Sequence, residues 1–248
     1  MEIVINQIEV VDYQVAINSQ NIIKAIMEHA LCDGFIVFPE LCLTGFPNKE
    51  NREALWQESN VYFQEIVLAS KQTNATIIIG HIEKYDNSLY NSCFFIKNAE
   101  IIHIHRKSKL WSDDIGIFAA GNSHTAIDVD GVLCASQICF ELEFPEGSRE
   151  LAKCGAQLVF MPNGNMHPYA NVHFVLAQAR AIENQFFVVV CNRVGKGHGG
   201  DFVGESLVIS PTGELLCKLG SKAGSAKITI DLNEVETARK NYTYTQLL

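Results

Sequence analysis

The order of the apolar segments restricts the fold of this chain more than any other feature. In the first third, short apolar runs at 3–10, 35–38 and 75–80 alternate with stretches of helical periodicity at 16–31 and 56–72. This alternation is typical of βαβ units, in which parallel strands share a sheet and helices pack against it. The first third of the chain therefore predicts an α/β fold.

The middle and the end of the chain add strands that are paired by tight turns. Two pairs of apolar runs are separated by only a few residues each: 89–96 with 100–105, and 125–129 with 132–138. Asp130 and Gly131, between the second pair, are a strong hairpin signal. Helix-favouring segments at 145–154 and 171–184 alternate with further short strand patterns: 157–161, 186–191, 204–210, 214–219 and 226–230. Crossovers and hairpins together predict mixed sheets with helices outside, in a layered α/β sandwich.

The chain is long and apolar enough for a substantial core. It has 248 residues, of which 48% are hydrophobic. No Pro-, Gly- or Ser-rich linker divides it, and no repeat or low-complexity segment interrupts it. We therefore expect residues 1–248 to form a single domain.

The charge of the chain argues against two classes of partner. The formal net charge is -9, and the only basic run, 103–109, is too short to make a stripe along a nucleic acid. No segment has the roughly 18 consecutive apolar residues of a membrane span. The N-terminus lacks the basic and apolar regions of a secretion signal. We expect a cytoplasmic protein that binds neither nucleic acid nor membrane.

Eight cysteines are scattered along the chain without a CxxC pair: 32, 42, 93, 134, 139, 154, 191 and 217. A chain of this size in a reducing compartment needs no disulfide framework. Most of the cysteines lie in apolar runs, where a free Cys behaves as a small buried hydrophobe. At most one or two of them are expected to react.

Three polar residues stand where predicted strands end. Cys139 follows the run 132–138 and precedes a helix, so it is held at a turn close to free backbone N–H groups. Glu40 follows a buried strand, at the edge where α/β sheets bind ligands. Lys107 closes the strand 100–105, and an ammonium near a thiol favours the thiolate. Taken alone, each is more often a core cysteine or a solvated charge.

The three residues lie in motifs that occur together in one known family. Residues 38–45, 105–110 and 139–146 resemble, in this order, the glutamate, lysine and cysteine motifs of the nitrilase superfamily of carbon–nitrogen hydrolases. Further stretches resemble the family in the same order: 89–92, 162–163, 178–185, 192–195 and 204–213. The resemblance covers almost the whole chain, which makes it far more specific than any single motif.

The resemblance implies both a fold and a set of roles. The fold would be a four-layer αββα sandwich of two mixed sheets, and two subunits would associate through outer helices as a homodimer. Glu40 would be the general base and Cys139 the nucleophile. Lys107 and the backbone N–H of Phe140 would stabilise the oxyanion.

No metal or organic cofactor is implied, because the reacting groups all come from the protein. Six histidines show no close metal-ligand spacing and are interpreted as structural or surface residues: 81, 103, 124, 167, 173 and 198.

Four positions depart from the motifs as the family usually has them: His105 and Phe140 for Tyr, Lys109 for His, and Glu141 for Asp. Most of these changes are conservative. Lys109 adds a charge near the site, and we expect it to influence substrate choice.

The position at which the family often has a second glutamate also differs in this chain. Asp114 stands four residues before Phe118 of a Phe-x-x-Gly motif, where the family often has a glutamate. Asp is one methylene shorter, so Asp114 and its neighbour Asp113 both remain candidates to position Lys107 or the substrate. Asn163, after the strand 157–161, is a further candidate for substrate binding.

The implied reaction is hydrolysis of a small linear amide to an acid and ammonia, through a cysteine thioester. The same three residues could serve an N-carbamoyl amine or amino-acid amidohydrolase, or a nitrile hydrolase. Acyl transfer to an amine and a non-catalytic binding protein with this fold are further alternatives. Glu143 stands where relatives that bind an anionic tail often carry Arg, which argues for a neutral or cationic substrate.

Overall fold

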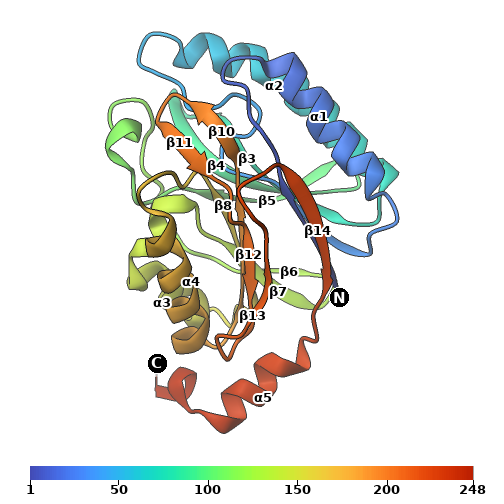
Figure 1. The fold of residues 1–248 in the computed structure, drawn as a ribbon, viewed down its shortest axis with the longest axis vertical. Coiled ribbons are helices and arrows are strands. Elements are labelled where there is room, and N and C mark those ends of the chain that lie inside the picture. The colour runs from blue at the N-terminus through green and yellow to red at the C-terminus, as the bar shows by residue number, and fades with distance from the viewer. Residues whose placement is uncertain (248) are drawn as a thin grey trace.

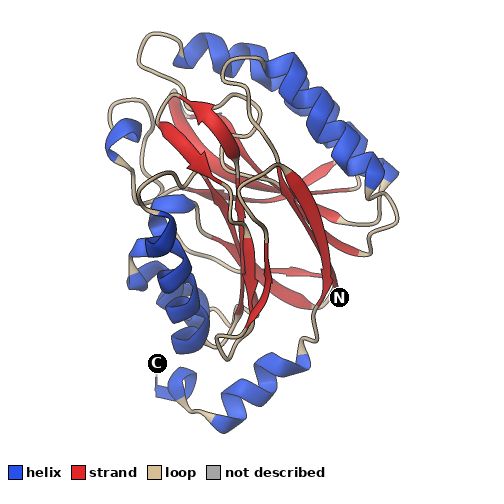
Figure 2. Ribbon diagram, viewed as in Figure 1, coloured by secondary structure: helices blue, strands red, loops and turns tan. Residues whose placement is uncertain are grey.

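Four layers of secondary structure make up this computed structural model, which describes residues 1–247. Two six-stranded sheets pack face to face, with helices on both outer sides (Figures 1 and 2). Helices α1 (Val15–Glu28) and α2 (Arg52–Ala69) cover one sheet. Helices α3 (Pro145–Lys153) and α4 (Ala170–Asn184) cover the other. The predicted αββα sandwich is confirmed.

The first sheet has the strand order β14-β1-β2-β3-β4-β5. Strands β1 to β3 are parallel, while β4, β5 and β14 join the sheet antiparallel. Its strands are β1 (Glu2–Gln7), β2 (Gly34–Val37), β3 (Thr76–Tyr85), β4 (Ser88–Lys97), β5 (Glu100–Arg106) and β14 (Gly224–Thr229).

The second sheet repeats this arrangement, with the order β13-β12-β9-β8-β7-β6. Strands β7 to β9 are parallel, and the others are antiparallel to their neighbours. Its strands are β6 (Ile127–Val129), β7 (Val132–Ser136), β8 (Leu158–Asn163), β9 (Phe187–Asn192), β12 (Leu207–Ile209) and β13 (Leu215–Lys218). In both sheets, therefore, three parallel strands end at a common edge.

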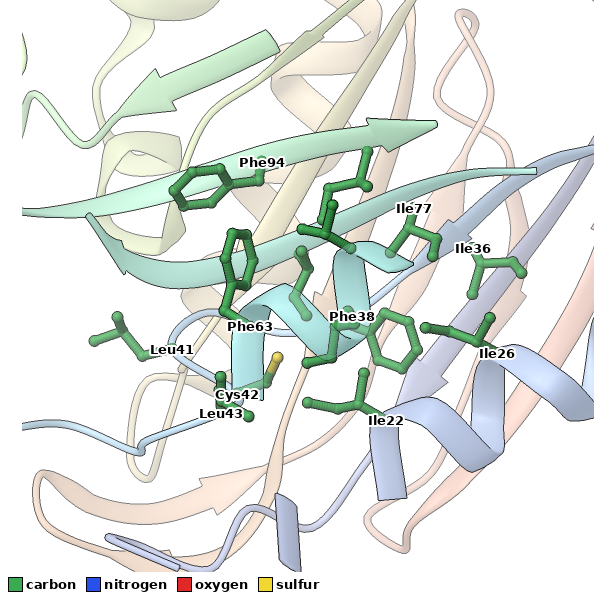
Figure 3. Packing of buried hydrophobic residues seen from close by; sticks show 14 of the residues in the cluster. Ile22, Ile26, Ile36, Phe38, Leu41, Cys42, Leu43, Phe63, Ile77 and Phe94 are labelled. Carbon is green, nitrogen blue, oxygen red and sulfur yellow. The ribbon is translucent and has the colours of Figure 1, made fainter. Parts of the chain in front are cut away.

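Strand β2 shows how the sequence builds two cores at once. Its side chains alternate between faces. Phe35 and Val37 join the core between the sheets, whereas Ile36, together with Phe38 just after the strand, packs under α1 and α2 (Figure 3). This double burial explains the uninterrupted apolar run. A third core lies between the second sheet and helices α3 and α4.

Two regular elements were not expected from the pattern. A hairpin of β10 (Val194–Gly197) and β11 (Gly200–Val203) is rich in glycine, which weakens strand signals. Helix α5 (Asn233–Asn241) is largely polar, and Gln185 anchors it by donating hydrogen bonds of 2.7 Å to the carbonyls of Ala238 and Tyr242.

One predicted strand, 204–210, is shorter in the structure and begins only at Leu207. Gly204 and Glu205 both adopt positive φ, which is incompatible with an extended strand. Over the described residues, none of the helices combines the length and the apolar character needed to cross a membrane.

Candidate active site

The edge where the parallel strands of both sheets end holds the three candidate residues. Glu40 follows β2, Lys107 follows β5 and Cys139 follows β7. All three line one cavity. The structure thus brings together residues that are far apart in the sequence.

A buried network of charges forms the floor of this cavity. The Lys107 ammonium donates hydrogen bonds to Glu40 Oε1, at 2.7 Å, and to Asp114 Oδ2, at 2.8 Å. Asn91 donates a second bond of 2.7 Å to the same Glu40 oxygen. Burial alone would lower the pKa of Lys107, but the carboxylates of Glu40 and Asp114 outweigh it and raise that pKa. Lys107 therefore stays positively charged.

The second oxygen of Glu40 is left free beside the thiol. Glu40 Oε2 is buried and accepts no hydrogen bond from any residue in 1–247. Cys139 lies close enough to Glu40 and to the backbone of Gly164 for both to influence its pKa. A Cβ on Gly164 would lie 2.9 Å from Glu40 Oε2 and 2.6 Å from the ring of Phe46, so only glycine fits between them.

Cys139 is held in an unusual backbone conformation. It opens the 3₁₀ helix η3 (Cys139–Glu143) with a φ of 47°, in the left-handed region that residues other than glycine rarely adopt. Such outliers cluster at functional sites. Burial and the nearby Glu40 carboxylate raise the pKa of the thiol well above its usual value, although Lys107 opposes this. The resting group is a neutral thiol.

Glu141 connects residues 105–108, around Lys107, to residues 138–141, around Cys139. Its Oε2 accepts hydrogen bonds from the Ile138 N–H and from His105 Nε2, both at 2.7 Å. Its Oε1 accepts from the Ser108 N–H at 3.0 Å and from the Ser108 hydroxyl at 2.6 Å. Burial would raise the pKa of Glu141, but His105 and Ser108 outweigh it and lower the pKa to about 2.

His105, His124 and Glu141 also place three potential metal ligands within 4.8 Å of one another. Sequence spacing did not reveal this cluster, because its members come from three separate segments. Both Glu141 oxygens already accept two hydrogen bonds each. The geometry therefore suits a structural hydrogen-bond network that holds two loops together.

The cavity walls are mainly aromatic. Five aromatic side chains and one methionine line them: Phe46, Trp111, Phe140, Met166, Tyr169 and Phe202. The rings of Phe46 and Phe202 stack with their centroids 5.7 Å apart. Trp111 packs edge-on against Phe140 and Tyr169. Polar side chains also line the cavity: Asp113, Glu143, Asn165 and His173.

The structure distinguishes Asp113 from Asp114, which the sequence left as alternatives for positioning Lys107 or the substrate. Asp114 is buried against Lys107, and it also accepts a hydrogen bond of 3.0 Å from the Trp111 N–H. Asp113 is exposed and lines the cavity. Asp114 is therefore the neighbour of Lys107, and Asp113 is in reach of a bound molecule.

The remaining predicted residues fall at different distances from the cavity. Phe140 and Glu143 line it, and Glu143 Oε1 lies 3.3 Å from His173 Nε2. Asn163 shares a hydrogen bond of 2.9 Å with His173 Nδ1, so it lies behind the lining. Lys109 is exposed, and its ammonium lies 5.4 Å from the centroid of the Phe144 ring.

Several site residues were not selected from the sequence as candidates. Asn91 belonged to a recognised stretch, but its bond to Glu40 was not anticipated. Gly164 directly follows Asn163, the last residue of β8. This place at a strand end was the feature of the sequence that could have marked Gly164 as a site residue. The aromatic lining comes from separate loops and carried no common spacing.

Comparison with known proteins identifies the family of this chain. Residues 5–240 match the family model described as carbon-nitrogen hydrolase. The chain is 33% identical to an (R)-stereoselective amidase of a Pseudomonas species, over 98% of this chain and 90% of that protein. It is 32% identical to a 2-oxoglutaramate amidase of Bacillus subtilis, over 90% of this chain and 89% of that protein.

A solved structure supports the same fold. A mutant of the amidase of Nesterenkonia AN1, from the nitrilase superfamily, superposes with a TM-score of 0.87 at 20% identity, over 100% of this chain and 97% of that one. Fold and sequence thus lead to the same family. The chain belongs to the carbon–nitrogen hydrolase family, within the nitrilase superfamily, and is an amidase-type hydrolase of carbon–nitrogen bonds.

Proposed function

We propose that this protein hydrolyses the carbon–nitrogen bond of a small linear carboxamide, giving an acid and ammonia through a thioester on Cys139. The observation that carries the proposal is the meeting of Cys139, Glu40 and Lys107 in one cavity. A buried thiol, a carboxylate with a free oxygen and a fixed cation are the groups that such a reaction needs.

The first half of the reaction forms the thioester. Since the pKa of Cys139 is raised, its proton must leave as the sulfur attacks, and Glu40 Oε2 is the free acceptor beside it. The sulfur bonds to the amide carbon, and the carbonyl oxygen becomes an oxyanion. Glu40 then gives the proton to the leaving nitrogen, and the carbon–nitrogen bond breaks to release ammonia.

The second half frees the acid. Glu40 takes a proton from a water molecule, whose oxygen attacks the thioester carbon. The carbon–sulfur bond breaks, the thiolate regains its proton from Glu40, and the acid leaves. Glu40 thus moves one proton in each direction during each half of the reaction.

Lys107 and the Phe140 N–H are the proposed oxyanion donors. Lys107 is fixed by two carboxylates, so it needs no rearrangement when charge develops. The Phe140 N–H lies in the first turn of η3, where backbone donors have no partner within the helix. Loss of one such donor costs about 3–4 kcal/mol of transition-state stabilisation.

Ammonia release from matched amides, N-carbamoyl amines and nitriles tests this function. We expect release from the amides, none with Cys139→Ala, and almost none with Glu40→Gln. A trapped acyl-enzyme should appear by mass spectrometry on the peptide that contains Cys139. Full activity of Glu40→Gln would contradict its role as the base.

Alkylation separates an enzyme from a binding protein of the same fold. Iodoacetamide should modify Cys139 faster than the exposed Cys154, because the free oxygen of Glu40 can take the proton of Cys139 as its sulfur attacks. The seven other cysteines provide the internal control. Equal reactivity of all eight would count against the catalytic interpretation.

We also propose that two chains form a homodimer through the outer face of α4. Val172, Val175 and Ile182 share this face at helical spacing, and they are 38%, 50% and 40% exposed. Exposed apolar side chains along one helix favour association. Val175→Glu should shift the sedimentation coefficient from dimer to monomer, whereas Val61→Glu on α2 should not.

A further inference from the structure

We propose that the substrate is a carboxamide with an apolar body whose far end carries a cation. This inference rests on the proposed function and names its substrate class. The observation behind it is the pairing of aromatic walls with two carboxylates, Asp113 and Glu143, in the cavity that contains Cys139.

The walls favour an apolar body. Stacked rings of Phe46 and Phe202 and the edge-on cluster of Trp111 offer flat apolar surface to a short carbon chain. Each methylene group that such walls remove from water stabilises the bound substrate. A compact polar amide would bury little apolar area against these walls.

The charges favour a cation. Among the lining residues in 1–247, Lys107 is the only Lys or Arg, and it is paired with Glu40 and Asp114. Asp113 and Glu143 are therefore not balanced by a lining Lys or Arg, and the only other basic group in the lining within 1–247 is the His173 imidazole. The Glu143 side chain is 27% exposed, and its carboxylate lies 3.3 Å from His173 Nε2. Cations bind well where carboxylates stand beside aromatic faces.

A buried cation behind the aromatic wall does not reverse this balance. Arg193 lies 4.0 Å from the Phe202 ring, but it is fully buried and does not line the cavity. Its guanidinium donates to the Val10 carbonyl and pairs with Asp12 at 3.1 Å. Arg193 thus supports the aromatic wall from behind, where an anionic substrate would not reach it.

The test uses three valeramides that differ only at the far carbon, which bears an ammonium, a methyl or a carboxylate group. We expect kcat/KM for ammonia release to fall in that order, with the ammonium compound about a hundredfold above the carboxylate, because like charges in a cleft repel. The inference is overturned if the methyl or the carboxylate compound is hydrolysed faster than the ammonium compound.

Variants assign the preference to particular residues. Glu143→Gln and Asp113→Asn should each lower the ratio of kcat/KM for the ammonium compound to that for the methyl compound, by about fivefold. Glu146→Gln, an exposed acid outside the lining, is the matched control and should leave the ratio unchanged. An unchanged ratio in both lining variants overturns the assignment.

A second measurement separates this inference from the proposed function. Each valeramide is tested for its ability to slow the alkylation of Cys139 by iodoacetamide. Strongest protection by the ammonium compound without any turnover would overturn the proposed function and support the cation preference. Turnover of all three amides with strongest protection by the carboxylate would support the function and overturn the inference.

Discussion

The two sheets contribute to the site in different ways. The first sheet supplies charges: Glu40 and Lys107 are buried, joined to each other at 2.7 Å, and supported by Asn91. The second sheet supplies Cys139 and Gly164, which are positioned by backbone shape, through a positive φ and a close approach. The half of the site that the first sheet supplies is held by ion pairing. The half that the second sheet supplies is held by the conformation of the backbone.

This difference predicts that two changes which abolish activity equally will lower the free energy of unfolding by very different amounts. Removing a charge from the first half leaves a buried partner without compensation, which destabilises the fold. Removing the thiol from the second half leaves the backbone in place.

The largest effect is expected for Lys107→Met. It would leave Glu40 and Asp114 buried without their cation, and should lower the free energy of unfolding by about 3–5 kcal/mol and abolish activity. Urea unfolding measures this loss. Lys84→Met, which removes an exposed ion pair, is the control and should cost under about 1 kcal/mol.

Cys139→Ala provides the other side of the comparison. It should abolish activity equally but change the free energy of unfolding by less than about 1 kcal/mol. If Cys139→Ala proved as destabilising as Lys107→Met, the two halves would not differ as described.

Glu141→Gln tests the connection between the halves. A neutral amide cannot accept all four of the hydrogen bonds that Glu141 accepts from Ile138, His105 and Ser108. We expect a loss of about 2–3 kcal/mol in unfolding free energy. We expect kcat to fall more than KM rises, because Cys139 and Lys107 lose their relative placement.

The control for this variant is Glu150→Gln, whose carboxylate is exposed and pairs with Lys153. Its stability and kcat should match the unmodified protein. A Glu141→Gln protein with normal kcat but reduced stability would limit Glu141 to a structural role.

Acid should destabilise the protein in part through His81, on the helix side of the first sheet. Burial between rings lowers the pKa of His81 to about 3 from an unfolded value of about 6.5. Stability is therefore complete above about pH 6.5 and falls as the pH drops toward 3, since only the unfolded chain takes up the proton. Glu141, with its pKa lowered to about 2, adds a loss below about pH 4.5.

Replacing His81 measures its contribution to the loss of stability in acid. His81→Leu should remove about 2 kcal/mol of the stability change between roughly pH 7 and pH 5, as measured by urea unfolding. His198→Leu, an exposed position, should leave the pH dependence unchanged. The same acid slope in both variants would rule out His81 as the cause.

The sequence predicted local features well, because they depend on neighbouring residues. The double burial of β2 follows from its apolar run, and Cys139 was expected at a strand-to-helix turn. The position of Glu40 at a sheet edge followed from the buried strand before it, and the αββα layers followed from the family resemblance.

Contacts between distant segments could not be read in this way. Asn91 is 51 positions from Glu40, and nothing in either segment indicates their hydrogen bond. The aromatic walls combine residues from loops of both halves, and each ring alone is an ordinary core or surface residue. The β10–β11 hairpin was missed because its glycines carry no side chain to form a pattern.

The smallest effect is expected for Lys109→Ala, and it corrects an expectation from the sequence. Lys109 was expected to influence substrate choice, yet it lies over Phe144 at 5.4 Å and does not line the cavity. An exposed contact of this kind contributes about 0.5–1 kcal/mol to stability. We expect kcat/KM for the three valeramides to stay within about twofold and their order to be kept. A reversal of that order would place Lys109 in the binding site and assign the control of substrate charge to Lys109 rather than to Asp113 and Glu143.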